Sequence, residues 1–309
     1  MSTTWRRLQG WAADELRSAG MEGSEREARW MVEEASGHEG EEFLEVVDTE
    51  PVDRARGRLE SMVARRCGGE PLQYVLGRWA FRGLDLMVDR RVLVPRPETE
   101  SVVDVALGEV DRLLERVDPA HDVVVSDMDD VVVSDMDDVV VVDLGTGSGA
   151  IALSVASERV RTRVWATDRS EDALVVATAN LGGLGRAAAR VRIARGSWFE
   201  ALDDDLRGRI GVVVSNPPYV DPSAPLPPEV VDWEPHAALF AADGGRADLE
   251  VIVTGAGSWL RPDGALVCEL SPEQATWALE LARGVFGEVG ILRDLAGRER
   301  ILLARHPRR

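Results

Sequence analysis

The sequence contains no lysine, so arginine supplies all 36 of its basic residues. Without lysine the protein has no side-chain amine that could act as a nucleophile or form a Schiff base. The two cysteines, Cys67 and Cys268, are far apart in the chain and indicate neither a disulfide framework nor a zinc site. The four histidines are scattered and show no paired ligand spacing. We therefore expect no metal centre.

Long apolar runs are also absent. No stretch approaches the roughly 20 apolar residues that span a bilayer, and residues 1–7 lead into an amphipathic pattern rather than the core of a signal peptide. We expect a cytoplasmic, monomeric protein that does not contact membranes. Acidic residues outnumber basic ones by 55 to 36, which gives a net charge of −19. Such a surface repels phosphate backbones and disfavours general nucleic-acid binding, although it does not exclude a local basic patch.

The 309 residues are enough for one large domain and one small domain. Residues 1–70 carry apolar side chains at helical spacing and predict a small helical bundle as the first domain. Within it, Ser24 and Glu27 have the spacing of a capping box at the start of the second helix, and Gly37 marks the end of that helix. Pro51 is predicted to open a third helix.

Residues 71–100 form the predicted linker between the domains. Short apolar runs at Leu84–Val88 and Val92–Val94 alternate with polar residues and predict a β-hairpin. A helix is expected to follow from about Ser101 to Val117. Residues 101–309 then make up the second domain.

That domain contains a tandem duplication. The octapeptide Asp-Val-Val-Val-Ser-Asp-Met-Asp occurs at 122–129 and again at 130–137. We predict that these two acidic copies form an exposed insert. A third, divergent copy begins at Asp138 and alone meets a glycine-rich loop, so it is the predicted first strand.

From that strand onward, strand and helix patterns alternate, which is typical of a doubly wound parallel sheet. The fold class predicted is therefore α/β and Rossmann-like. Two further segments near the C-terminus are expected to add an antiparallel edge pair. The predicted strands are 138–144, 163–168, 191–195, 210–215 and 264–270, with the edge pair at 287–294 and 300–305.

The glycine-rich loop follows the first strand and opens a helix near Ala150. Its glycines permit a tight turn and a close approach of the backbone to a ligand. Asp168 ends the next strand, about 20 residues on, where a carboxylate accepts both ribose hydroxyls of an adenosine-containing cofactor. The competing interpretation is an N-cap for the following helix. The loop residues are Gly145, Thr146, Gly147, Ser148 and Gly149.

A second motif, Asn216-Pro217-Pro218-Tyr219, closes a buried strand. Open α/β folds bind ligands at that end of their strands. The Asn216 amide and a prolyl carbonyl can hold a flat polar NH₂ group, while Pro217 and Pro218 keep the backbone rigid and Tyr219 covers the face of the group. An adenine base and a carboxamide would both fit.

NAD and S-adenosylmethionine are both compatible with the glycine-rich loop. A dehydrogenase needs a proton donor near its substrate carbonyl, and only His236 lies near a plausible loop. Methyl transfer instead needs the accepting nitrogen to be held in line, and positioning alone supplies roughly 7–11 kcal/mol. We therefore favour a methyltransferase that uses S-adenosylmethionine.

Over nearly its whole length the chain resembles the HemK/PrmC family of protein-(glutamine-N5) methyltransferases. DNA adenine-N6 methyltransferases and some rRNA methyltransferases also contain the Asn-Pro-Pro-Tyr motif. The Pro-Arg-Pro-Glu-Thr-Glu segment is what narrows the resemblance to the HemK/PrmC family. The segments that carry the resemblance are Gly69–Tyr74, Leu93–Glu100, Asp143–Leu153, Val214–Val220 and Arg293–Arg298.

The resemblance implies methylation of the glutamine in the Gly-Gly-Gln motif of peptide chain release factors, which modulates translation termination. It implies that the helical domain docks the release factor and the hairpin fixes the angle between domains. Catalysis would fall to Asn216, Pro217 and Tyr219. Pro218 would join them in binding the substrate, and Trp198 and Asn216 would join the glycine-rich loop and Asp168 around the cofactor.

The chain departs from the family at Ser197, where relatives often have Asp, and at Ser271, where many have Gly. Two rival functions stay open. One is a DNA or rRNA amino-group methyltransferase, and the other is a non-catalytic scaffold that binds S-adenosylmethionine.

Overall fold

The computed structural model describes residues 3–116 and 138–308. The octapeptide copies at 122–137 lie outside the described residues. The chain divides into two compact units, which are described separately below. The first comprises Met1–Trp79, Val88–Arg90 and Leu226–Glu234, and the second comprises Ala80–Met87, Arg91–Pro225 and Pro235–Arg309.

The first unit is a helical bundle with its own apolar core. Leu16, Met31, Phe43 and Leu59 are completely buried in that core, because each lies on the apolar stripe of its helix. The predicted bundle is confirmed. Its helices are α1 (Trp5–Ser18), α2 (Ser24–Ser36), α3 (Gly40–Val46), α4 (Asp53–Cys67) and α5 (Leu72–Leu76), together with the short α9 (Pro228–Val231).

The predicted capping box at Ser24 is wrong. Gly23 takes the N-cap position with φ 72°, so Ser24 is the first residue of α2 and its side chain caps nothing. Glu27 instead accepts a hydrogen bond from Arg66 of α4 at 2.7 Å, and both side chains are buried. The helix predicted to open at Pro51 is present as α4, but it begins at Asp53, and because α3 precedes it, it is the fourth helix and not the third.

The predicted hairpin is present, but with other boundaries. Strands β1 (Arg78–Phe81) and β2 (Leu84–Met87) pair with each other, whereas Val92–Val94 is not a strand. Helix α6 (Pro97–Glu115) begins four residues earlier than predicted, because proline at the first helical position has no amide hydrogen to leave unpaired.

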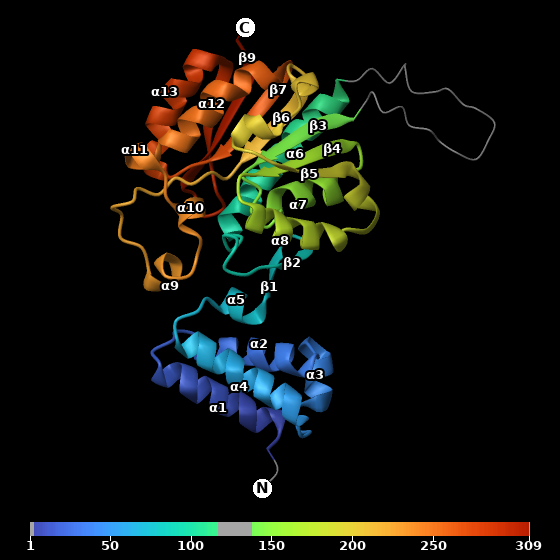
Figure 1. Cartoon of the computed structure of the whole chain (residues 1–309), viewed down its shortest axis with the longest axis vertical. Coiled ribbons are helices and arrows are strands. Elements are labelled where there is room, and N and C mark those ends of the chain that lie inside the picture. The colour runs from blue at the N-terminus through green and yellow to red at the C-terminus, as the bar shows by residue number, and fades with distance from the viewer. Residues whose placement is uncertain (1–2, 117–137, 309) are drawn as a thin grey trace, which may run out of the picture. The chain divides into compact units, whose positions relative to one another are not determined.

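The second unit is built on a seven-stranded sheet in the order β5-β4-β3-β6-β7-β9-β8 (Figure 1). Its first five strands are parallel, and β9 pairs antiparallel with both β7 and β8, which confirms the Rossmann-like prediction and the antiparallel edge pair. The strands are β3 (Val139–Leu144), β4 (Thr162–Asp168), β5 (Val191–Arg195), β6 (Ile210–Ser215), β7 (Leu260–Glu269), β8 (Phe286–Arg293) and β9 (Glu299–Pro307).

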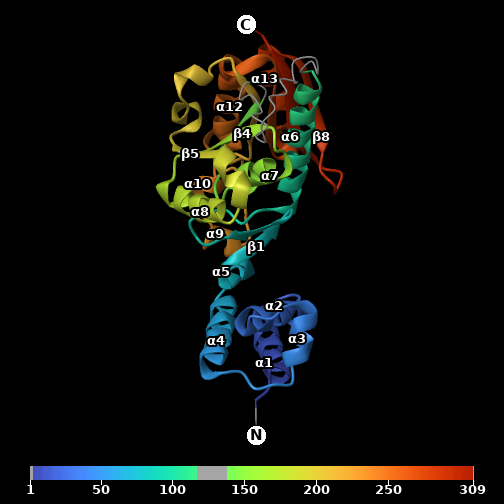
Figure 2. The same ribbon diagram turned by 90° about the vertical axis from the view of Figure 1, so that its right-hand side faces the viewer.

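Helices cover both faces of this sheet. Alternate residues of β3 enter the two cores: Val139 and Val141 pack with α6 and α7 (Ala150–Glu158), and Val142 and Leu144 pack with α12 (Ala247–Trp259) and α13 (Ala275–Val285). Figure 2 views the face that α7 and α8 (Glu171–Gly182) cover. From β3 the chain adds β4 and β5 on one side of the sheet and then β6 and β7 on the other side. The loops after β3, β4 and β6 therefore border the crevice where such folds bind ligands.

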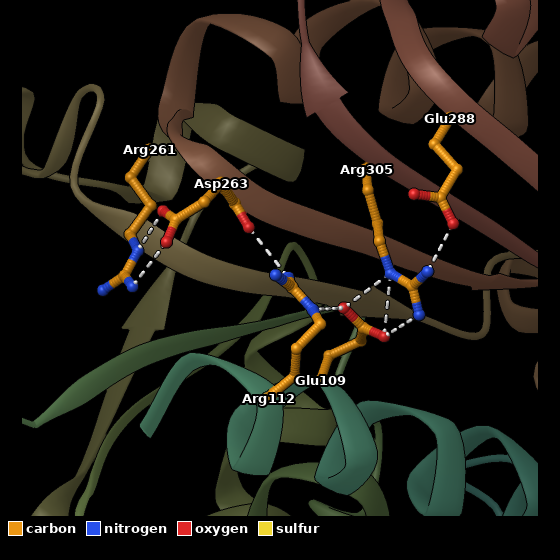
Figure 3. A network of polar contacts seen from close by, with 6 residues as sticks. All are labelled: Glu109, Arg112, Arg261, Asp263, Glu288 and Arg305. Atoms are coloured by element: carbon orange, nitrogen blue, oxygen red, sulfur yellow. Dashed lines mark hydrogen bonds and ion pairs between the residues drawn. The ribbon is translucent and has the colours of Figure 1, made fainter. Parts of the chain in front are cut away.

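An ion-pair network fixes α6 to the antiparallel edge of the sheet (Figure 3). Glu109 is buried and accepts hydrogen bonds from Arg112 at 2.7 Å and from Arg305 of β9 at 3.0 Å. Arg305 also pairs with Glu288 of β8. Burial alone would raise the pKa of Glu109, but the two arginines outweigh it and hold that pKa below its ordinary value.

None of the described helices is both long enough and apolar enough to cross a membrane.

Candidate active site

A cavity in the second unit lies at the carboxyl ends of the parallel strands. The glycine-rich loop, the segment after β4, the segment after β5 and the loop after β6 all border it. The segment before α6 closes another side, so Val92 and Leu93, although not in a strand, contribute to the cavity wall. The lining includes Val92, Leu93, Arg96, Thr99, Gly145, Thr146, Gly147, Ser148, Asp168, Ser197, Trp198, Asn216 and Pro218.

The glycine-rich loop adopts a backbone that side chains would oppose. Gly145, Gly147 and Gly149 have φ of 74°, 55° and 88°, in the left-handed region where glycine carries no steric penalty. A Cβ at Gly145 would lie 3.4 Å from the ring of Trp198. The loop is thus a cradle of bare backbone, as an adenosine-containing ligand requires.

Asp143 fastens this loop to the sheet, a role that the sequence did not reveal. One of its carboxylate oxygens accepts hydrogen bonds from the Thr146 hydroxyl at 2.6 Å and from the Ala152 amide at 3.1 Å. Burial raises the pKa of Asp143 to about 7 because the charged form loses its hydration.

Asp168 lies beside the glycine-rich loop, as predicted. Its two carboxylate oxygens accept hydrogen bonds from the amides of Gly147 and Ser170, each at 2.9 Å. The N-cap of α8 is Ser170, whose hydroxyl accepts from the Ala173 amide, so Asp168 does not cap that helix. A carboxylate has about four lone-pair positions, which leaves room for a pair of ligand hydroxyls.

Trp198 forms another wall of the cavity. Its φ of 49° is unusual for a bulky residue and costs of order 1–3 kcal/mol. Burial raises the pKa of Asp248 of α12, and an interaction with the Trp198 side chain opposes that rise. No pattern in the sequence pointed to Asp248.

The four residues of the Asn-Pro-Pro-Tyr motif separate in the structure. Asn216 and Pro218 line the cavity, whereas Pro217 is buried and neither it nor Tyr219 belongs to the described lining. The carbonyl of Tyr219 accepts a hydrogen bond from Gln274 at 3.1 Å, and Gln274 also donates to Gly245 at 2.7 Å.

A buried polar chain lies behind Asn216. Asn216 Nδ2 donates to Thr99 Oγ1 at 3.1 Å, and the Thr99 hydroxyl donates to Glu269 Oε2 at 2.7 Å. The Tyr219 hydroxyl donates to Glu269 Oε1 at 3.2 Å. Burial raises the pKa of Glu269 to about 7 and also raises the pKa of Tyr219, so the phenol keeps its proton. Thr99 falls in the segment Leu93–Glu100 that carries the family resemblance, whereas Glu269 falls in none of those segments. A hydrogen bond between residues 170 positions apart leaves no local signal in the sequence.

No group of three or more His, Cys, Asp or Glu side chains in residues 3–116 and 138–308 could hold a metal ion.

The chain is similar to known proteins in both units. The profile described as "PrmC N-terminal domain" matches residues 7–77, and that described as "Methyltransferase small domain" matches residues 114–227. Among solved structures, the hMettl16 catalytic domain in complex with MAT2A 3'UTR hairpin 1 aligns with a TM-score of 0.50 and 16% identity, over 82% of this chain and 80% of that chain. At this identity the likeness concerns the fold alone.

Relatives that align over the full length of the chain have higher sequence identity than the hMettl16 structure. Release factor glutamine methyltransferase of Moorella thermoacetica is 36% identical and aligns over 97% of this chain and 98% of that protein. The same enzyme of Burkholderia pseudomallei is 37% identical and aligns over 96% of each. Because these similarities extend over both units, the chain belongs to the release factor glutamine methyltransferase family.

Proposed function

We propose that this protein transfers a methyl group from S-adenosylmethionine to the side-chain amide nitrogen of the glutamine in the Gly-Gly-Gln motif of peptide chain release factors. The observation that carries the proposal is Asn216, whose side chain lines the same cavity as the glycine-rich loop and Asp168. The close full-length relatives are named for this activity.

The cavity fits S-adenosylmethionine, which supplies a methyl group activated by its sulfonium. The bare backbone of Gly145–Gly149 would receive the methionine end, and the Asp168 carboxylate would accept the ribose hydroxyls. Trp198 would lie against the adenine. These roles use a backbone that substitution would strain at Gly145 and Gly147.

Asn216 would orient the substrate. Its carbonyl oxygen can accept a hydrogen bond from the glutamine NH₂ and stabilise the positive charge that develops on that nitrogen. Asp168 is the sole carboxylate in the described lining, and both its oxygens already accept backbone amides. The site therefore favours catalysis by positioning over catalysis by a general base.

We further propose that the helical bundle at residues 1–70 docks the release factor. This division of labour explains why the described cavity residues all belong to the second unit, while the family match also includes residues 7–77.

A methyl-transfer assay tests the proposed function. Purified release factor, bare DNA and rRNA are offered separately with labelled S-adenosylmethionine, and the Gly-Gly-Gln peptide is then examined by mass spectrometry. We expect label on the glutamine of the release factor only. Asn216→Ala should lower kcat by about 10²–10³-fold and leave the Kd for S-adenosylhomocysteine within about threefold. Label on nucleic acid alone, or full activity of Asn216→Ala, would overturn the proposal.

A further inference from the structure

The polar chain behind Asn216 has a fixed direction. A carboxylate only accepts hydrogen bonds, so the single proton of the Thr99 hydroxyl is committed to Glu269 at 2.7 Å. Thr99 Oγ1 can then only accept from Asn216, which must turn its NH₂ group toward it, as it does at 3.1 Å.

We propose that Glu269 is a positioning residue that acts through Thr99 and sets the orientation of the Asn216 amide, so that Asn216 presents its carbonyl oxygen to the substrate NH₂. The inference rests on the proposed function, because only an NH₂-bearing substrate needs an acceptor at this place. Glu269 itself is fully buried and does not belong to the cavity lining.

The carboxylate is well placed to keep this direction. Its other oxygen accepts from the Tyr219 hydroxyl at 3.2 Å, so each oxygen has a donor. Arg300 of β9 lies near enough to favour the charged form, whereas Glu98 and burial oppose it. Three separate parts of the chain thus converge on this carboxylate at the end of β7: the start of α6, the loop after β6 and strand β9.

Replacing Glu269 by an apolar side chain of similar length would reverse the direction of the hydrogen bond between Thr99 and Asn216. In Glu269→Met the Thr99 hydroxyl has lost its acceptor, and the nearby oxygen of Asn216 becomes the alternative. Asn216 would then rotate its amide, accept from Thr99 and turn its NH₂ toward the substrate NH₂. Two donors facing each other cannot form the hydrogen bond that holds the substrate.

The kinetic test is a double-mutant cycle at pH 8, where Glu269 is ionised. We expect kcat to fall about 100-fold in Glu269→Met. Thr99→Val, which only removes the hydroxyl, should cost about 10-fold because Asn216 then has no imposed direction. The kcat of the double variant should equal that of Thr99→Val and so be higher than that of Glu269→Met alone. If Glu269 had only a structural role, the losses of kcat from the two substitutions would instead add in the double variant. Glu273→Gln, an exposed carboxylate close by in sequence, is the control and should retain full activity.

A spectroscopic test does not depend on activity. The chain has two asparagines, Asn180 and Asn216, so selective ¹⁵N-asparagine labelling gives two side-chain NH₂ signals. We expect Glu269→Met to shift the Asn216 signal and leave Asn180 unchanged, because the Asn180 amide group is bonded to the backbone of Met87 and Ser148. Asn216→Ala assigns the signals by deleting one of them.

The outcomes separate the two proposals. If the wild-type protein does not methylate a release factor, the proposed function fails whatever the spectra show. If the wild type is active but the Asn216 signal is unmoved in Glu269→Met, or the double variant is less active than both single ones, the positioning role is wrong and the proposed function stands. Retained affinity for S-adenosylhomocysteine in each variant verifies that the cavity is intact.

Discussion

At the scale of the residue, Asp168 shows how one side chain can shape a site and also serve it. Its carboxylate holds the Gly147 and Ser170 amides, each at 2.9 Å, and so ties the glycine-rich loop to the end of β4. The lone pairs that remain face a cavity bordered by bare backbone. The same carboxylate can therefore order the loop and accept the ribose hydroxyls.

We predict that Asp168→Ala raises the Kd for S-adenosylhomocysteine by about 10²–10⁴-fold, since two hydrogen bonds to a charged group are worth roughly 1.5–3 kcal/mol each. Isothermal titration calorimetry measures this directly. Glu171→Ala removes an exposed carboxylate three residues further on and should leave the Kd within about twofold. Equal affinity of the wild type and Asp168→Ala would show that the ribose lies elsewhere.

How far the sequence predicted this site depends on the kind of residue. Glycines, prolines and Asn216 belong to short motifs, so their neighbourhood in the chain reveals them. Glu269 and Asp248 belong to none, because each acts on a partner distant in sequence, Thr99 or Trp198, through a contact that only folding creates. Short motifs therefore pointed to the cofactor loop and to Asn216 but could not reveal what stabilises the Asn216 amide.

At the scale of the element, the loop after β6 is supported by a tight backbone contact. Gly245, at φ 81°, lies so close to the Tyr219 carbonyl that a Cβ there would overlap its oxygen. Gln274 bridges the same two residues. The junction before α12 therefore sets the position of the Asn-Pro-Pro-Tyr motif.

We predict that Gly245→Ala lowers kcat by about 100-fold, the cost of moving a positioning loop by about 1 Å. Gly244→Ala is a matched control, because Gly244 has a similar φ of 65° but its Cβ would meet only Asp221 Oδ2, at 3.6 Å. Both variants should lose about 1–2 kcal/mol of stability from left-handed strain. Comparable kcat values for the two would contradict the supporting role.

The ion-pair network around Glu109 should make the free energy of unfolding depend on pH. Glu109→Gln should lower the free energy of unfolding by about 2 kcal/mol near pH 7, because a buried acceptor for Arg112 and Arg305 is lost. The pKa of Glu109 is lowered in the folded state, so its contribution is complete above the unfolded pKa near 4.5 and is lost as pH falls from there through the lower pKa of the folded state. Urea unfolding at pH 7 and pH 3.5 measures this difference, with the exposed Glu115→Gln on the same helix as control.

The sequence predicted most elements but fewer of their ends. The buried strands β3 to β6 were found almost to the residue, because their apolar runs are bounded by turns. Strand β7 begins four residues before the predicted 264, where Arg261 and Asp263 hide the strand by pairing with each other. Such pairs are invisible to apolar periodicity, and the same reason explains the mistaken role of Glu27.

At the scale of the whole molecule, the two units have separate apolar cores, and the described cavity residues belong to the second unit. The net charge of −19 disfavours a nucleic-acid partner. Substrate docking by the first unit and cofactor binding by the second can therefore be tested independently of each other.

Leu59 is completely buried in the first unit, so Leu59→Ala should destabilise that unit by about 2–5 kcal/mol through the lost packing and the cavity left behind. We predict that methylation of an intact release factor falls at temperatures where the bundle unfolds, while the Kd for S-adenosylhomocysteine stays at the wild-type value. Leu59→Met keeps the volume and should preserve both. The measurements are calorimetric titration and methyl transfer over a range of temperatures. If cofactor affinity falls in step with methylation, the cavity depends on the bundle and the proposed division of labour is wrong.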